Sequence, residues 1–472
     1  MLRRWLAALA VAVAVAASLV AGALPSGSAL CLAQPRAVAA PPAGPGASGI
    51  AVRTLRNGMK VIVWPDHDIP NVALYFVYRV GSRNERPGIT GISHFFEHMM
   101  FNGSAQFPGG EFDRLMEAGG GANNAYTSQD VTVYQDWFPR SALDLIFRLE
   151  ADRICCLSFD STSVESERGV VSSERRTSVD SDSREALDEQ VQATAYLAHP
   201  YMIPIIGWPS DIERWAIGDL ERYFRTYYAP NNATMVVVGD VTPAEIFGLA
   251  ERYIEPIPSQ PPPPPVETVE PPQNGERRLT LRRPAPAPLL EVVYHAGAAD
   301  DRDAEAEQLL VSILARGESS RLYRRLVDQD RSAIHVWAGA QAGFDPGLFY
   351  FFVTVSPEKG VSAAEAALYE ELDRIAREGV SEAELAKAKR IQLAAHWRSL
   401  ETIDGKADEI GQAEVFLGEY RRLFDAPDRY AKVTQAQIRS LAKRIFAPGN
   451  RTVGVVEPVA EPPGASGKGG AR

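Results

Sequence analysis

The chain repeats itself once, and this repeat constrains its fold more than any other feature of the sequence. The segment Tyr227–Asp240, YYAPNNATMVVVGD, matches Ile445–Pro458, IFAPGNRTVGVVEP, at an offset of 218 residues. The segment Phe76–Ser82, FVYRVGS, matches Val292–Ala298, VVYHAGA, at an offset of 216 residues. Two matches in the same order and at nearly the same offset indicate a duplication that produced two homologous halves.

Each half has the pattern of a mixed α and β domain. It begins with strand-like alternation such as VALYFVYRV, continues through long helical stretches and ends in a β-rich segment such as ATMVVVGD. Strands and helices follow one another without a regular β-α alternation. The sequence therefore predicts the α+β class, with each half a mostly antiparallel sheet that has helices packed on one face.

A proline run marks the boundary between the halves. Residues 256–275, PIPSQPPPPPVETVEPPQNG, contain five consecutive prolines, which exclude a helix or a central strand and predict an extended linker. A proline ligand for an SH3-type domain is the alternative. We expect a first domain over 49–255 and a second over 276–458. Residues 31–48 and 459–472 are rich in Ala, Pro and Gly, which predicts a flexible leader and a disordered tail.

The N-terminus is typical of an export signal. Two arginines precede an Ala/Val-rich apolar run, Trp5–Leu24, and residues that break a helix follow it. Residues 1–30 are therefore predicted to be a signal peptide of an exported, periplasmic or extracellular protein. A retained membrane anchor is the alternative, because about 20 apolar residues can span a bilayer. Lipidation at Cys31 is disfavoured, because Leu30 precedes it where lipoprotein signals have a small residue.

Charge and cysteine content exclude some classes of protein. The net charge of −11 disfavours a nucleic-acid partner, because proteins that bind nucleic acids are usually basic. Three cysteines do not make a disulfide framework. Cys155 and Cys156 are adjacent, and neighbouring cysteines rarely bridge, so we expect small, buried, reduced residues at a helix end.

One short stretch carries metal-binding chemistry. In GISHFFEHMMFNGS, residues 91–104, His94 and His98 are four residues apart and lie on one face of a predicted helix. Glu97 lies on nearly the same face, where it would touch a water on a metal rather than the metal itself. Two imidazoles leave a zinc site one protein ligand short. An ordinary amphipathic helix with some polar residues is the alternative.

The third ligand is sought on a long acidic helix predicted over residues 162–191. Glu167 and Glu174 are seven residues apart on that helix, so they share one face, two turns from each other. Their spacing alone does not choose between them. Solvated glutamates beside arginines are the alternative interpretation.

These motifs resemble those of a known family. His94-Phe95-Phe96-Glu97-His98 is an H-x-x-E-H sequence, the signature of inverzincins, and ERGVVSSE follows at residues 167–174. Over residues 49–458 the chain resembles the M16 family of pitrilysin, insulinase and mitochondrial processing peptidase. The resemblance implies one Zn²⁺ per chain, held by His94, His98 and Glu174. It also implies Glu167 as the acidic companion of this site and Glu97 as the group that activates water for peptide hydrolysis.

The resemblance extends to substrate binding and assembly. The segment GGGANNAYTSQDVTVY resembles the family's edge strand, which implies that Asn124 and Ala125 line the cleft and that an extended peptide pairs with the strand. Arg321, in SSRL, resembles the family's substrate-binding arginine, but Ile334 replaces the expected tyrosine. This departure resembles the zinc-bearing subunits of two-subunit members. It implies a heterodimer with a second M16-like subunit that carries the Arg-Tyr pair; a homodimer is the alternative.

The second half provides an internal comparison. At an offset of 216, His94, Glu97 and His98 map to Leu310, Ile313 and Leu314, which are all apolar, so we expect no metal site there. The predicted function is a zinc-dependent endopeptidase that hydrolyses unfolded peptides or small proteins. A non-catalytic subunit of the same fold, serving assembly or binding peptides, is the alternative.

Overall fold

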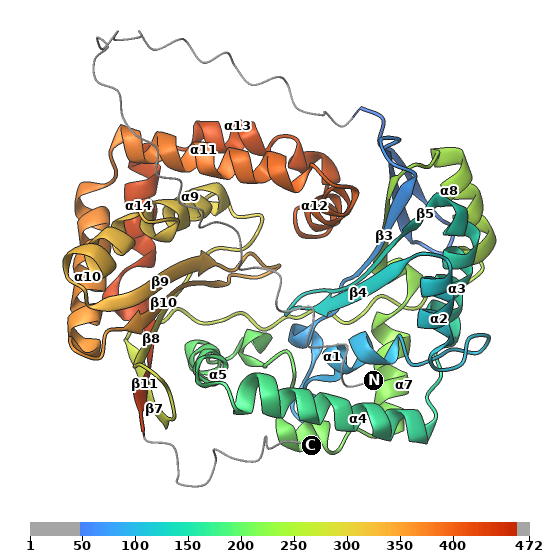
Figure 1. Cartoon of the computed structure of the whole chain (residues 1–472), viewed down its shortest axis with the longest axis horizontal. Helices are drawn as coiled ribbons and strands as arrows, with labels where there is room; N and C mark the ends of the chain where they lie inside the picture. The colour runs from blue at the N-terminus through green and yellow to red at the C-terminus, as the bar shows by residue number, and fades with distance from the viewer. Residues whose placement is uncertain (1–47, 460–472) are drawn as a thin grey trace, which may run out of the picture. The chain divides into compact units, whose positions relative to one another are not determined.

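Residues 48–459 are described by the computed structural model, and their strands form two sheets (Figure 1). The predicted signal peptide, nearly all of the leader and nearly all of the tail lie outside these residues. Among the described residues, no helix is both long and apolar enough to cross a membrane.

The first sheet has six strands in the order β1-β2-β6-β3-β5-β4. Only β2 and β6 pair in parallel, and the other neighbours are antiparallel. β3 and β6 are buried on both faces, which suits their runs of β-branched and aromatic residues. The strands are β1 Ala51–Thr54, β2 Lys60–Pro65, β3 Asn71–Tyr78, β4 Ala122–Thr127, β5 Thr132–Pro139 and β6 Ala233–Gly239.

The second sheet has five strands in the order β7-β11-β8-β10-β9. Only β7 and β11 pair in parallel, so apart from β1 the two sheets share one strand order and one parallel pair at the same place. The predicted α+β class with two similar halves is confirmed. The strands are β7 Arg277–Arg283, β8 Leu289–His295, β9 Ala333–Ala340, β10 Leu348–Val355 and β11 Arg451–Pro458.

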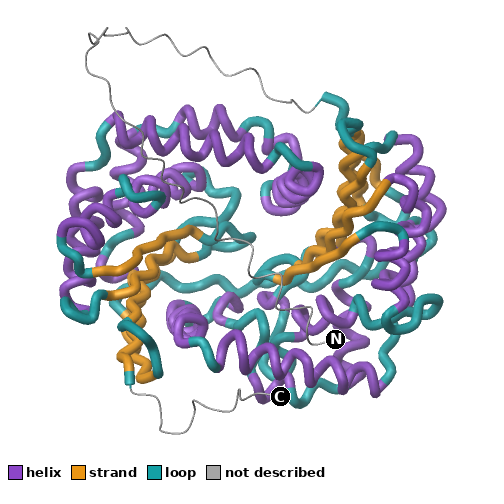
Figure 2. The backbone as a smooth tube through the Cα atoms, in the orientation of Figure 1, coloured by secondary structure: helices purple, strands orange, loops and turns teal. Residues whose placement is uncertain are grey.

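Helices flank both sheets (Figure 2). Several begin at side-chain caps: Asp160 accepts two backbone N–H bonds at the start of α4, and Ser381 and Glu384 cap α11 reciprocally. The helices are α1 Ile92–Met99, α2 Glu111–Ala118, α3 Leu143–Cys156, α4 Ser161–Arg175, α5 Ser183–Ala195, α6 Pro209–Ile212, α7 Ile217–Tyr227, α8 Pro243–Leu249, α9 Ala304–Ala315, α10 Val361–Glu378, α11 Glu382–Ser399, α12 Ile403–Phe416, α13 Ala426–Lys432 and α14 Gln435–Ile445.

Two helices are exchanged between the halves. α5 comes from the first half, but Leu187 and Val191 pack against Val293 and other buried residues of the second sheet. α12 comes from the second half, but Ala407 and Ile410 belong to the hydrophobic cluster of the first sheet. Each sheet therefore has its own helices on one face and a helix of the other half on the opposite face, an arrangement that the sequence did not indicate.

The two exchanged contacts use opposite combinations of small and large residues. On the second sheet, Gly454 faces Val191 of α5, and a Cβ atom at Gly454 would lie 2.3 Å from Val191 Cγ2. On the first sheet the glycine is in the helix, because Gly411 of α12 faces Val77 and Val236. Val236 and Gly454 are 218 residues apart, which is the offset of the repeat. Both contacts therefore pair a glycine with valine, but the glycine lies in the strand in the second sheet and in the helix at the first sheet.

We expect Gly454→Ala to lower the free energy of unfolding by about 1–3 kcal/mol, because the added methyl group overpacks the contact with Val191. Val191→Ala in the same chain should recover part of this loss. Gly248→Ala is the matched control, since no atom lies within 4 Å of a Cβ atom at that helical glycine. Equilibrium denaturation by urea measures all three. Equal stability of Gly454→Ala and wild type would contradict the packing argument.

The proline-rich segment is extended and fixed at several points. Residues 256–275 contain no helix or strand. The Asn231 side chain donates to Gln260 O at 2.8 Å and accepts from Gln260 N at 3.0 Å. Farther along, the Glu270 carboxylate accepts the backbone N–H groups of 197–199. The segment is held against the first half rather than only joining two domains.

The predicted position of the adjacent cysteines at a helix end is confirmed, but the prediction that they are buried and do not bridge is wrong. Cys155 and Cys156 form a disulfide at the end of α3, and neither is among the buried residues of that helix. The helix ends at Cys156, and the next residue, Leu157, has extended backbone angles. Both cysteines are thus exposed residues of the last helical turn.

Candidate metal centre

The helix α1 is held rigidly in the first half. Phe95, Phe96 and Met99 lie in the core, while His94, Glu97 and His98 occupy the other face. At the N-terminus of the helix, the buried Glu85 carboxylate accepts the backbone N–H groups of Gly91 at 2.6 Å and Ser93 at 2.8 Å. Burial raises the pKa of Glu85 to about 8, although both N–H bonds oppose this shift.

The two histidines converge on Glu174 of α4. His98 Nε2 lies 3.3 Å from Glu174 Oε2, and His94 Nε2 lies 3.7 Å from Glu174 Oε1. One ligand atom from each of the three residues lies within 4.8 Å of the other two. Two imidazoles and one carboxylate are a donor set that suits zinc with an open fourth position. The structure thus brings together the three residues that the family resemblance implies as ligands.

Glu167 lies behind the histidines. Its Oε1 atom is 2.7 Å from His98 Nδ1, the nitrogen that faces away from Glu174, and its Oε2 atom accepts from Asn102 Nδ2 at 2.7 Å. A carboxylate on the outer nitrogen fixes the orientation and tautomer of a ligating histidine. The sequence analysis missed Asn102, which lies just beyond the end of α1, four residues after His98.

The pKa values of the two histidines in this cluster are shifted in opposite directions. Burial lowers the pKa of His98, but bonds and charges of Glu167 and Glu174 outweigh it and raise the pKa to about 10. Burial, together with the charge of His98, lowers the pKa of His94 to about 4. His94 Nδ1 is buried without a hydrogen-bond partner among the described residues. Two carboxylates thus lie against His98, and their negative charge favours a cation at this place.

Glu97 is separate from the three candidate ligands. Burial raises the pKa of its carboxyl group, while hydrogen bonds from the Thr127 hydroxyl and backbone N–H oppose this shift. Thr127 is the last residue of β4. The sequence analysis missed this residue, because nothing in the spacing of the motifs connects it to α1.

The strand β4 lies at the edge of the first sheet, beside α1. It pairs with β5 alone, with Asn124 opposite Gln135 and Ala125 opposite Tyr134. Asn124 is exposed, and Ala125 packs against the core cluster that contains α1. The free edge leaves backbone groups available to an extended peptide.

Comparison with known proteins adds independent information. The model of the insulinase family, peptidase family M16, matches residues 60–207, and the model of the peptidase M16 inactive domain matches residues 215–392. The zinc protease PqqE of Helicobacter pylori is 30% identical over 380 residues, which cover 79% of this chain and 86% of that protein. The chain belongs to peptidase family M16.

Other M16 relatives and a solved structure are similar over most of their length. The uncharacterized zinc protease YmxG of Bacillus subtilis is 24% identical over 403 residues, covering 83% of this chain and 95% of that protein. The crystal structure of a protease from Helicobacter pylori superposes with a TM-score of 0.83 at 28% identity, covering 87% of this chain and 99% of that chain.

The counterpart of α1 in the second half of this M16 chain is α9, and its register differs from the predicted one. The order of buried and half-buried residues over 92–100 recurs almost unchanged over 306–314, at an offset of 214 rather than 216. The mapping to Leu310, Ile313 and Leu314 is therefore wrong by two residues. The connection before α9, residues 296–303, is shorter than the connection before α1, residues 79–91, which explains the shift.

In the corrected register, Gln308, Val311 and Ser312 replace His94, Glu97 and His98. Gln392 of α11 corresponds to Glu174 at the repeat offset of 218. Its Nε2 atom donates to Ser312 Oγ at 2.8 Å and to Gln308 O at 3.0 Å. Hydrogen bonds between neutral groups thus occupy the place where the first half gathers imidazoles and carboxylates.

Arg321, the expected substrate-binding arginine, is engaged within the second half. Its guanidinium donates to both oxygens of Glu384, at 2.6 and 3.0 Å, and to Gly379 O at 3.1 Å. The bond to Arg321 lowers the pKa of Glu384 to about 2. None of the polar partners found for Arg321 in the described part of the chain comes from the first half. Ile334, where the tyrosine was expected, lies on edge strand β9 and is 58% exposed.

We expect Arg321→Met to lower the free energy of unfolding by about 1–3 kcal/mol at neutral pH, because it removes a two-pronged charged hydrogen bond. Because the pKa of Glu384 is depressed in the folded state, this stabilisation is present above the unfolded pKa near 4.5 and disappears as the pH falls towards about 2. Urea denaturation at pH 7 and pH 3 measures the difference. A raised KM for peptide with unchanged stability would instead assign Arg321 to the substrate.

Proposed function

We propose that this chain is a zinc-dependent endopeptidase that hydrolyses unfolded peptides or small proteins. The observation that carries the proposal is the convergence of His94, His98 and Glu174. Glu97 of the same helix α1 contacts Thr127, the last residue of the edge strand β4. The names of the relatives, zinc proteases, support the same chemistry.

One zinc ion per chain would be held by His94 Nε2, His98 Nε2 and a carboxylate oxygen of Glu174. When bound, zinc supplies a Lewis acid that polarises a carbonyl group and brings water into a reactive range near neutral pH. The donor set fits this ion, because the imidazoles and the carboxylate meet on one side and Glu167 orients His98 from the other.

The chain's own groups perform the proton transfers. Glu97 accepts the proton of the attacking water at its carboxylate and then donates it to the nitrogen of the leaving amine. Its raised pKa, caused by burial, makes it a better base than an exposed glutamate. The substrate would be positioned by backbone hydrogen bonds to β4, with Asn124 and Ala125 lining the path.

We further propose that the active assembly is a heterodimer. Ile334 stands where a substrate-gripping tyrosine is expected, and Arg321 is bound to Glu384. A second M16-like subunit that carries the Arg-Tyr pair would complete the substrate side. The protein is proposed to be exported through its N-terminal signal. A protein of similar fold, the protease PqqL of Escherichia coli, is described as periplasmic.

The test is cleavage of an unfolded peptide by purified protein, with and without a chelator and with and without the partner subunit. We expect hydrolysis that the chelator stops and that zinc restores. If the protein binds peptide tightly with zinc present or absent and cleaves none, the non-catalytic alternative, an assembly or peptide-binding subunit, is correct.

A further inference from the structure

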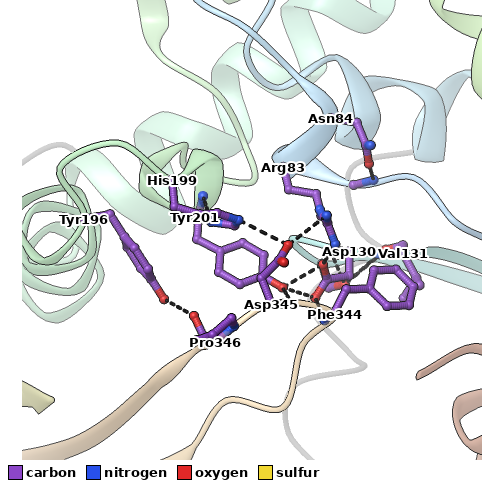
Figure 3. Close-up of polar contacts among 12 residues, drawn as sticks. Arg83, Asn84, Asp130, Val131, Tyr196, His199, Tyr201, Phe344, Asp345 and Pro346 are labelled. Carbon is purple, nitrogen blue, oxygen red and sulfur yellow. Dashed lines mark hydrogen bonds and ion pairs between the residues drawn. The ribbon is translucent and has the colours of Figure 1, made fainter. Parts of the chain in front are cut away.

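A largely buried polar network, which includes none of the three candidate ligands, joins four segments from both halves (Figure 3). We call it the clasp: Arg83, Asp130, His199, Tyr201 and Asp345. The Tyr201 hydroxyl donates to the Asp130 carboxylate at 2.8 Å, and Arg83 bridges the two aspartates, at 3.1 Å to Asp130 and 2.8 Å to Asp345. His199 Nε2 lies 3.1 Å from Asp345 Oδ2.

The second half contributes the connection between β9 and β10, which enters the clasp closely. The backbone N–H of Asp345 donates to the Tyr201 hydroxyl at 3.1 Å, and that of Phe344 donates to Asp130 Oδ2 at 3.3 Å. A Cβ atom at Gly343 would lie 2.3 Å from the Tyr201 hydroxyl oxygen. Only a glycine allows the connection to come this close.

The clasp joins the two halves through charged groups that are costly to remove from water. The side chains of Arg83 and Asp130 are 11% and 5% exposed, and that of His199 is 4% exposed. Burying charges costs desolvation energy that their mutual attraction only partly returns, and apolar replacements of such groups are often as stable. A network of this kind is better suited to fixing geometry than to adding stability.

The segment that the clasp holds in place is connected to Glu97 through the end of β4. Asp130 lies in the turn of residues 128–131, which immediately follows β4. Two more bonds hold this turn, from Arg83 N to Gln129 O at 2.9 Å and from Ser82 N to Ser128 O at 3.2 Å. Thr127, the residue before the turn, donates to the Glu97 carboxylate. A displacement of the turn therefore moves the groups that orient Glu97.

We propose that the clasp makes the second half position Glu97 and the end of β4, with Tyr201 and Asp345 as positioning residues. This inference rests on the proposed peptidase function. It gives the second half, which has no metal ligands at its own counterpart site, a role in the reaction of the first.

The experiment compares Tyr201→Phe, Asp345→Asn and their double variant in the full chain, with zinc content measured for each. Asp330→Asn is the matched control, because Asp330 is another aspartate of the second half that pairs with an arginine, Arg325, and its side chain is 30% exposed, against 32% for Asp345. We expect kcat per bound zinc to fall about tenfold in either single variant, because small misplacements of reacting groups are costly. KM should stay within about twofold, and the double variant should lose no more than about a single one, because both act in one network.

A merely structural role would lower the zinc-loaded fraction or the melting temperature and leave kcat per bound zinc unchanged, and this result would overturn the inference. Amide hydrogen exchange at residues 127–131 provides a readout that needs no activity: it should be faster in Asp345→Asn and unchanged in Asp330→Asn. Unchanged exchange in both variants also overturns the inference. A wild-type chain that binds zinc but cleaves no peptide even with the partner subunit present would refute the proposed function alone, and exchange would still decide the role of the clasp.

Discussion

Replacing Glu97 with glutamine abolishes peptide hydrolysis and leaves zinc bound: this is the result we expect to be largest. Glutamine has the shape of glutamate and can still accept from Thr127, but it cannot take a proton from water. General acid–base groups typically contribute about 10²–10⁴-fold to the rate, so kcat should fall by this factor while KM changes little.

The measurement is kcat and KM with a fluorogenic peptide, together with zinc content by metal analysis. Glu165→Gln is the matched control, because Glu165 lies on the neighbouring helix α4 with its side chain 68% exposed and pairs only weakly with Arg168. That variant should retain full activity. Near-normal hydrolysis by Glu97→Gln would remove Glu97 from the mechanism.

The second large effect concerns the metal. Glu174→Ala removes the single carboxylate that approaches both histidines, and two imidazoles alone hold zinc poorly. We expect the dissociation constant for zinc to rise by at least about a hundredfold and hydrolysis to stop, with loss of zinc preceding loss of fold.

The variant Glu167→Gln tests whether Glu167 is itself a zinc ligand or only orients the ligand His98. If Glu167 acts only on His98 Nδ1, its loss should weaken zinc binding by about 10–100-fold, less than the loss of Glu174. Competition titration with a chromogenic chelator gives both constants. Tight, stoichiometric zinc in Glu174→Ala would place the third ligand elsewhere, with Glu167 as the next candidate.

The sequence predicted the residues of the site that lie close together on one helix, but it did not predict the contacts that depend on tertiary packing. Helical periodicity placed His94, Glu97 and His98 on one face, because that relation is fixed within two turns of one helix. Spacing left Glu167 and Glu174 equivalent, and the family resemblance chose Glu174 as the ligand, which agrees with its position between the histidines. Thr127 contacts Glu97 through the fold alone, so no pattern in the chain could reveal it.

The errors have a common cause. The predicted register of α9 assumed that a constant offset continues from a strand through a loop into a helix, but loop lengths change freely between repeats. The cysteine prediction placed the pair correctly at a helix end but took both residues as buried and unbridged, whereas they are exposed and form a disulfide in the last turn of α3. Both errors arise at element boundaries, where sequence patterns are weakest.

The exchanged helices α5 and α12 also determine when the chain can become stable. The second face of the first sheet is covered by α12, which begins at Ile403, and by Leu400, Tyr420 and Leu423 beside it, so a nascent chain must be nearly complete before that face is buried. Contacts of such long sequence separation close slowly and leave apolar strands exposed in the interval. Each half looks like an independent domain in sequence, yet neither can finish folding before the other has been made.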